Sequence, residues 1–281
     1  MKMAPAAIHE WVTNGLVVQT LPPITNTPRL LHSPVYGTLH AMVSKRNVVT
    51  PAALSHAAAP GTAVLLPPLE NGDRLSRDEF EERYCAMPEL KKAELIEGVV
   101  YMPSPVRFAQ HSQPHARIVG WLAAYCAATP GVELGDNATV RLDSDNEVQP
   151  DALLRLPAHA GGRSRISADD YVEGAPELIV EVATSSAAYD LHDKFHVYRR
   201  NQVQEYLVWQ VYDRRLDWFA LNEGRYVPLV PQGATLESRV FPGLRLAVDA
   251  MLNGDLAAVM AELQSGVQTP EHAAFVQRLR G

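Results

Sequence analysis

Two acidic residues of this chain stand inside apolar stretches. Asp151 lies in QPDALLRL and Glu181 in PELIVEVA, and both stretches have the composition of core strands. A carboxylate buried there without a partner would cost free energy or shift its pKa. Two carboxylates at the middle of adjacent strands can instead hold a divalent metal that activates water. The pattern therefore predicts a metal-dependent hydrolytic site.

A helix is expected directly after the second of these strands, with Asp190 and Lys194 four residues apart. Taken alone, that spacing indicates an ordinary surface ion pair. The position favours a functional role, because a helix one short loop after Glu181 can lie back over the acids. A lysine there could bind a scissile phosphate or orient the attacking water, and it would neutralise charge in the transition state.

Structural roles for the two acids remain open at this stage. Asp151 could cap a loop or pair with an arginine such as Arg155, and Glu181 could be a charge at a sheet edge. The sequence favours a structural role less for Glu181 than for Asp151, because apolar residues flank Glu181 on both sides.

Histidines offer weaker signals. His192 and His196 have the spacing of zinc ligands, but the glutamate of the H-E-x-x-H metalloprotease motif is missing between them. His111 and His115 precede an expected helix and could contact a substrate, although exposure to solvent is the commoner outcome for such residues.

Bulk properties limit the class of protein. The chain has 281 residues, 47% of them hydrophobic, which is enough for a real core in one or two domains. A formal charge of −7 excludes a globally basic surface, so nucleic acid would need a local patch. The two cysteines, Cys85 and Cys126, form no C-x-x-C pair, and we expect buried, reduced thiols. Without an apolar run that could span a bilayer or an N-terminal secretory signal, the sequence predicts no membrane association and a cytoplasmic location.

The expected elements follow from periodicity and turn residues. Residues 1–68 are rich in proline and are expected to be a disordered extension, before a domain over 69–255 and a helical tail over 256–281. The expected elements are a helix from Ser76, a hairpin over 93–102 turning at Glu97-Gly98, a helix over 115–127, strands over 132–142, 148–156 and 178–183, a helix ending near Asn201, and strands over 205–212, 215–221 and 225–230. This order predicts an α/β (α+β) domain with a central mixed β-sheet flanked by helices.

The ordered motifs ELIEGVVYMPSP, a histidine before a helix, QPDALL, GAPELIVEVATSS, YDLHDKFHVYRR and VQEYLVW carry a resemblance. Together they resemble the Uma-two family of restriction endonucleases, a branch of the PD-(D/E)XK nuclease superfamily. The similarity covers roughly residues 70–255. It implies a restriction-endonuclease-like core, one or two Mg²⁺ ions, with Mn²⁺ as a substitute, and hydrolysis of phosphodiester bonds in DNA.

The resemblance also implies roles for individual residues. Asp151 and Glu181 match the two metal-binding acids, and Glu94 matches the acid that opens the first strand, with Glu97 as an alternative third acid. The lysine two residues after the second acid is replaced by Ala183.

The resemblance implies that the following helix supplies that lysine, which here is Lys194. Gln202 stands where the family has glycine, and Asn201 could absorb the turn. Substrate contacts are expected from His115, Gln149 and Asp190, with DNA as partner and a homodimer as the assembly. Two rival functions stay open: a non-catalytic binding module, and a metal hydrolase of a small phosphorylated molecule.

Overall fold

The computed structural model describes residues 66–102, 105–184 and 192–281. All of them belong to one compact unit, Thr62–Gly281. The predictions for residues 1–65 and for Asp190 therefore lie outside the described residues.

The described chain contains both helices and strands. The helices are α1 (Arg77–Cys85), the π-helix Phe108–Ser112, α2 (Gln113–Ala128), a 3-10 turn (Ala158–Ala160), α4 (Asp193–Arg200), α5 (Val248–Asn253), α6 (Leu256–Val267) and α7 (Pro270–Arg280). The strands are β1 (Glu94–Ile96), β2 (Val99–Tyr101), β3 (Glu133–Asp136), β4 (Val140–Asp143), β5 (Asn146–Val148), β6 (Ala152–Arg155), β7 (Arg165–Ile166), β8 (Val172–Glu173), β9 (Leu178–Ala183), β10 (Glu205–Gln210), β11 (Arg215–Asn222), β12 (Arg225–Pro228), β13 (Thr235–Glu237) and β14 (Arg245–Ala247).

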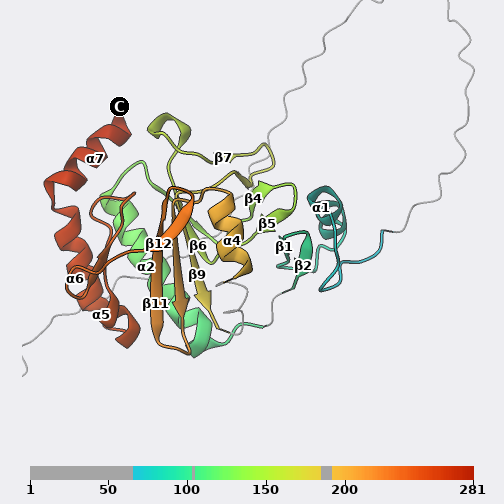
Figure 1. The fold of residues 1–281 in the computed structure, drawn as a ribbon, viewed down its shortest axis with the longest axis horizontal. Helices are drawn as coiled ribbons and strands as arrows, with labels where there is room; N and C mark the ends of the chain where they lie inside the picture. The colour runs from blue at the N-terminus through green and yellow to red at the C-terminus, as the bar shows by residue number, and fades with distance from the viewer. Residues whose placement is uncertain (1–65, 103–104, 185–191) are drawn as a thin grey trace, which may run out of the picture. The chain divides into compact units, whose positions relative to one another are not determined.

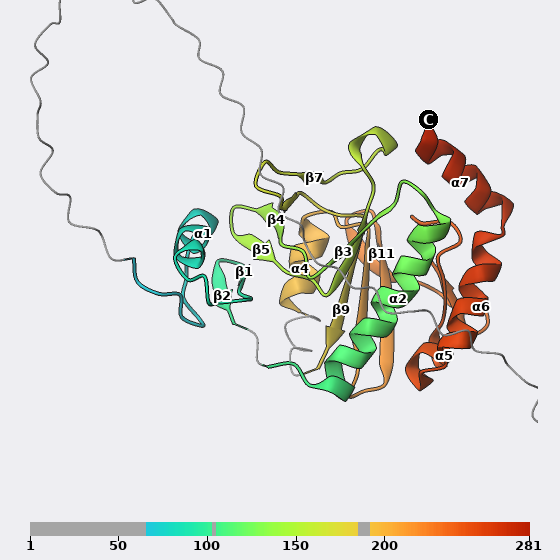
Figure 2. The same ribbon diagram turned by 180° about the vertical axis from the view of Figure 1, so that it is seen from behind.

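A central six-stranded sheet organises the domain, in the order β12-β11-β10-β9-β6-β3. Within this sheet, as far as the structure describes it, β9–β10 is the one parallel pair and the other neighbours are antiparallel, so the sheet is mixed. Figures 1 and 2 show α4 over one face of this sheet and α2 over the other, with α5, α6 and α7 at one side. The predicted fold class, a mixed sheet flanked by helices, is confirmed.

The parallel β9–β10 pair explains why α4 lies over the sheet. Two parallel neighbours need a crossover connection, and a helix usually supplies it. Val197 and Tyr198 of α4 are buried against Ile179 and Tyr206 of the two strands, in the core on that face of the sheet. The crossover thus brings the first turn of α4, with Lys194, close to Glu181 of β9.

A second sheet, β2-β1-β5-β4-β8-β7, lies beside the central one. Its hairpin turns at Glu97-Gly98, as predicted, with both residues at positive φ (52° and 72°). That conformation is typical of a two-residue type I′ turn. The helix start is confirmed too, because the Ser76 side chain accepts the N–H of Glu79 as the N-cap of α1.

Two predicted strands are each broken in the structure, which corrects the sequence interpretation. The stretch 132–142 splits into β3 and β4 around Asn137, whose φ is 51°, and 148–156 splits into β5 and β6. In both cases the two halves belong to different sheets. Pro150 lacks the N–H that a continuous ladder requires, which accounts for the second break. Asp151 therefore stands at the corner where the chain passes from one sheet to the other.

Smaller corrections concern helix ends and a cysteine. The left-handed conformation after α4 falls on Gln202 (φ 64°) and not on Asn201 (φ −81°), so the position where the family has glycine is the one that needs it. Cys85 is exposed at the end of α1, contrary to the expectation of a buried thiol, because α1 buries only Phe80. Cys126 is partly buried.

The C-terminal helices belong to the main core. Leu263 of α6 and Phe275 of α7 pack in the same cluster as Trp121 of α2 and Trp218 of β11. Trp121 and Trp218 meet edge to face, with ring centroids 5.8 Å apart. The predicted tail thus covers the face of the sheet opposite α4.

Candidate active site

Lys194 joins two buried acids from different sheets. Its Nζ lies 2.9 Å from Oε1 of Glu181 and 3.0 Å from Oε1 of Glu94. All three residues are at least nine-tenths buried. The interpretation of Lys194 as part of a surface ion pair is therefore wrong, and three of the predicted site residues do meet.

The sheet holds Glu181 in its interior. β9 lies between β10 and β6, so the alternative of a charge at a sheet edge is excluded. The Tyr198 hydroxyl donates to the same Oε1 at 2.7 Å. Tyr198 stands one turn after Lys194 on α4, so both project from one face of the helix. Sequence analysis missed this tyrosine, although its four-residue spacing from Lys194 was visible.

The first strand fixes Glu94. Its Oε1 also accepts the backbone N–H of Gln149 at 2.7 Å, which ties β1 to the corner between the sheets. Glu97, the alternative third acid, is instead exposed at the hairpin turn and pairs with Arg200. Geometry thus places Glu94, and not Glu97, with Glu181 and Lys194.

At the start of β6, the carboxylate of Asp151 accepts a backbone hydrogen bond from β9. The last registered pair of β6 and β9 is Ala152 with Val180, so Asp151 is the next residue along, opposite Glu181. Its Oδ2 accepts the backbone N–H of Val182 at 2.7 Å. The alternative of a pair with Arg155 is wrong, because that guanidinium pairs with Glu133.

Two histidines contact Asp151, His111 from the π-helix before α2 and His115 from the first turn of α2. His111 Nε2 lies 3.3 Å from its Oδ1, and His115 Nε2 lies 2.9 Å from its backbone oxygen. His115 Nε2 is also 3.0 Å from Oδ1 of Asp136. Both partners of that nitrogen can only accept, so it must carry a proton. His115 therefore contacts the backbone of a predicted site residue, and His111, expected to be exposed, joins the carboxylate.

These contacts keep Asp151 ionised. Burial by itself raises the pKa of this carboxyl, but the hydrogen bond and charge of His111, the charge of Lys92 and the N–H of Val182 outweigh it. The net result is a pKa below the usual range of an aspartate. Asp151 is thus available as an anion at neutral pH.

Gln149 does not present its side chain to a substrate here. Its Nε2 donates to the Thr139 hydroxyl at 3.0 Å, and the residue is buried. In this arrangement Gln149 fixes the corner and, through its backbone N–H, the Glu94 carboxylate.

The donor set fits a hard divalent cation. Glu94 and Glu181 contact the buried lysine, and Asp151 lies opposite Glu181 in the strand register. Three buried carboxylates thus outnumber one buried ammonium, so the site favours a further positive charge. Within the described ranges, no three His, Cys, Asp or Glu side chains are grouped to hold a metal by themselves. Mg²⁺ commonly uses only one or two carboxylates and completes its shell with water and substrate phosphates, which suits this arrangement.

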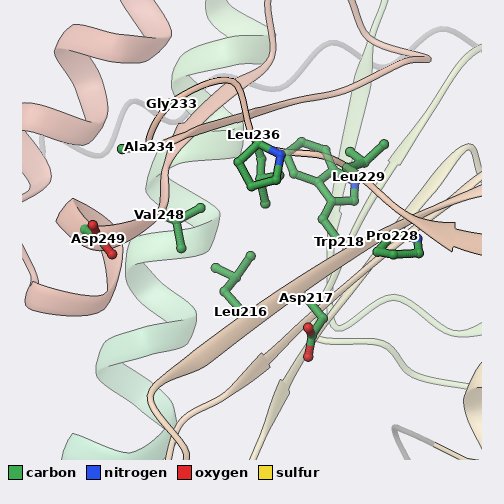
Figure 3. A pocket seen from close by; sticks show the side chains of 11 residues that line it. Leu216, Asp217, Trp218, Pro228, Leu229, Gly233, Ala234, Leu236, Val248 and Asp249 are labelled. Atoms are coloured by element: carbon green, nitrogen blue, oxygen red, sulfur yellow. The ribbon is translucent and has the colours of Figure 1, made fainter.

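A cavity of about 350 Å³ lies elsewhere, between β11 and α5 (Figure 3). Most of the side chains around it are apolar, including Leu216, Leu236 and Val248, with Asp217 and Asp249 beside them (Figure 3). The Asp217 carboxylate of this lining accepts hydrogen bonds from the side chains of Gln210 and Arg215. The cavity lacks the convergent ionised groups found around Lys194, so the buried cluster is the better candidate for catalysis.

Comparison with known proteins identifies the family. A family model described as Uma2, putative restriction endonuclease, matches residues 77–249. The chain belongs to the Uma2 family. The matched region contains Glu94, Asp151, Glu181 and Lys194. The resemblance seen in the ordered motifs is thereby confirmed, and the Uma2 chain is a member of a nuclease family, which implies a nucleic-acid substrate.

The solved structures similar to the Uma2 chain include the crystal structure of a putative nuclease from Anabaena variabilis, 12% identical, with a TM-score of 0.48, covering 61% of this chain and 96% of that one. No curated protein sequence matches this chain significantly. In the described part of the Uma2 chain, no helix combines the length and the apolar character that crossing a bilayer requires.

Proposed function

We propose that this Uma2 protein is a Mg²⁺-dependent endonuclease that hydrolyses phosphodiester bonds in DNA. The observation that carries the proposal is the buried contact of Lys194 with Glu94 and Glu181, next to an Asp151 held in its ionised form. Burying three acids and one lysine carries a desolvation cost that their mutual contacts offset only in part. Such charge clusters are typical of active sites.

The acids would hold the metal. Asp151 and Glu181 are the predicted ligands for Mg²⁺ or Mn²⁺, and Glu94 is a further ligand or the group that orients water. When bound, such an ion lowers the pKa of a water molecule and stabilises the charge that develops on the phosphate.

The remaining groups position the acids and neutralise negative charge. Lys194 supplies a buried positive charge for a phosphoryl oxygen, where low dielectric strengthens the interaction. Tyr198 and Lys194 together fix the orientation of Glu181, through Oε1. His111 keeps Asp151 in the anionic form that a metal ligand requires.

Other parts of the proposal come from the sequence. DNA as the substrate, a homodimer and a cytoplasmic location are proposed, as is a substrate contact by Asp190. Two free cysteines, Cys85 and Cys126, agree with a reducing compartment. Size-exclusion chromatography with light scattering tests the dimer directly.

A nicking assay on supercoiled plasmid with Mg²⁺, Mn²⁺ or EDTA tests the function, together with calorimetric titration of the metal. We expect cleavage with either metal and none with EDTA, and Lys194→Met and Asp151→Asn should abolish it. Glu97→Gln is the matched control, since this exposed acid sits three residues from Glu94 in the same hairpin. Metal binding without DNA cleavage would favour a small phosphorylated substrate, and no metal binding would favour a non-catalytic module.

A further inference from the structure

An exposed apolar edge precedes α2. Residues 105–109 are all exposed, and the side chains of Val106 and Phe108 are 66% and 72% exposed. Single exposed apolar residues are common, but an aromatic and an aliphatic side chain two residues apart form a more unusual surface. Arg107 lies between them and is exposed as well.

The backbone couples this edge to the candidate active site. Phe108 begins the π-helix Phe108–Ser112, a rare conformation that often marks functional sites. His111 of the same turn donates its N–H to the Arg107 carbonyl at 2.9 Å, and its ring reaches 3.3 Å from Oδ1 of Asp151. The exposed side chains are therefore held by the same turn that touches the predicted metal ligand.

The local charge suits a polyanion. The chain carries −7 overall, so a nucleic acid requires a local cationic patch. Arg107 contacts only Gln110, at 3.5 Å, among the hydrogen bonds found in the described residues, so its charge remains available to a ligand. Lys92 adds a second cation near the acid, because its charge acts on Asp151.

We propose that Val106, Arg107 and Phe108 form a DNA-binding edge. In it, the Phe108 ring stacks on an unpaired base beside the phosphodiester held at the active site. Arg107 binds a neighbouring phosphate. The inference rests on the proposed nuclease function and narrows its substrate to DNA with unstacked bases at the cut, such as single strands, gaps or frayed ends. Stacking on an aromatic side chain suits such bases, since every base has an exposed ring face once unpaired.

Binding to two oligonucleotides separates this role from general affinity. Fluorescence anisotropy of the full chain in EDTA, which prevents cleavage, would compare a single strand with a blunt duplex of the same sequence. Phe108→Ala should weaken binding to the single strand about 10-fold and to the duplex less than about 2-fold. Phe108→Trp should restore the affinity, and its indole fluorescence should be quenched by the single strand.

Arg107→Ala should weaken the binding of both oligonucleotides. It should also reduce the salt dependence of the binding constant by about one phosphate contact. Val230→Ala is the matched control, because Val230 is 79% exposed and follows β12, outside the segment that contacts Asp151. It should change neither affinity. Circular dichroism verifies that every variant is folded.

Three outcomes decide against the proposal. If Phe108→Ala leaves single-strand affinity unchanged while the wild type still cleaves DNA, the stacking role fails and the nuclease function stands. If Phe108→Ala changes the oligomeric state and not the affinity, the edge is a contact between copies of this chain. If the wild type neither binds nor cleaves any DNA, the proposed function itself fails.

Discussion

The neighbouring parallel strands β9 and β10 each bury a glutamate, and the two acids face opposite sides of the central sheet. Glu181 shares its face with Ile179, under α4, whereas Glu205 shares its face with Leu207, towards α2. Both acids are almost fully buried. Their partners differ: Glu181 contacts the ammonium of Lys194 and a tyrosine hydroxyl. Glu205 accepts hydrogen bonds from the Trp218 indole, the Ser238 hydroxyl and the N–H groups of residues 239 and 240.

The partners decide what each acid can do. Neutral donors satisfy Glu205 and fix the loop after β13, but burial still dominates and raises its pKa to about 7. Glu181 lies with a cation and with a second acid, Glu94. An acid in an apolar strand is therefore a sign of burial, and the charge of its partners is what separates Glu181, the proposed metal ligand, from Glu205.

The largest expected effect separates the two acids by activity. Glu181→Gln should lower the rate of plasmid cleavage by about 10³-fold, equivalent to about 4 kcal/mol, because one metal-binding charge is lost. Glu205→Gln should change the rate less than about 3-fold. Single-turnover cleavage by folded protein measures both. Equal losses of cleavage rate in the two variants would show that the different partners of the two acids do not give them different roles.

The stability of the fold, unlike the cleavage rate, should depend strongly on Glu205. Glu205→Ala leaves several buried donors without an acceptor and should lower the free energy of unfolding by about 3 kcal/mol. Urea denaturation measures the change, with Glu97→Ala as an exposed control expected to cost under about 0.5 kcal/mol. An intact free energy of unfolding in Glu205→Ala would contradict a structural role.

The pH dependence of stability sharpens the assignment of Glu205. Its raised pKa means that the folded state holds a proton that the unfolded chain has released between pH 4.5 and 7. This stabilisation is complete below pH 4.5 and is lost as the pH rises through 7, about 2 kcal/mol between pH 5 and 8.

Glu205→Gln should remove that part of the slope in urea titrations. Glu147, whose pKa burial and the neighbouring Glu81 raise to about 8, gives a slope of the same sign that the variant keeps. A slope in Glu205→Gln identical to that of the wild type would argue against a protonated Glu205.

The smallest expected effect tests which contacts orient the Glu181 carboxylate. Tyr198→Phe removes the hydroxyl that donates to Oε1 and leaves the ring in the core. We expect a loss of about 1 kcal/mol in stability and about a 10-fold weaker metal affinity by calorimetry. Metal affinity unchanged in Tyr198→Phe would mean that Lys194 alone orients the acid.

Local signals predicted many of the elements and some of the site. The capping serine at position 76, the Glu97-Gly98 turn and the apolar run of β9 act over a few residues, and the structure contains all three. Breaks within strands were missed because Asn137 and Pro150 redirect the chain towards a partner sheet that no local pattern reveals. Glu205 was missed as a second buried acid because its sequence context, VQEYLVW, was seen only as a strand.

By itself the sequence determined that Glu181 is buried, since apolar residues flank it on both sides, and that a helix with Lys194 follows it. It also determined the family, through motifs in a fixed order. Only the tertiary structure decided that Lys194 reaches both Glu181 and Glu94, and that His111 lies against Asp151. Those contacts join residues far apart in the chain, and they exist because the β9–β10 crossover and the corner at Pro150 bring two sheets together.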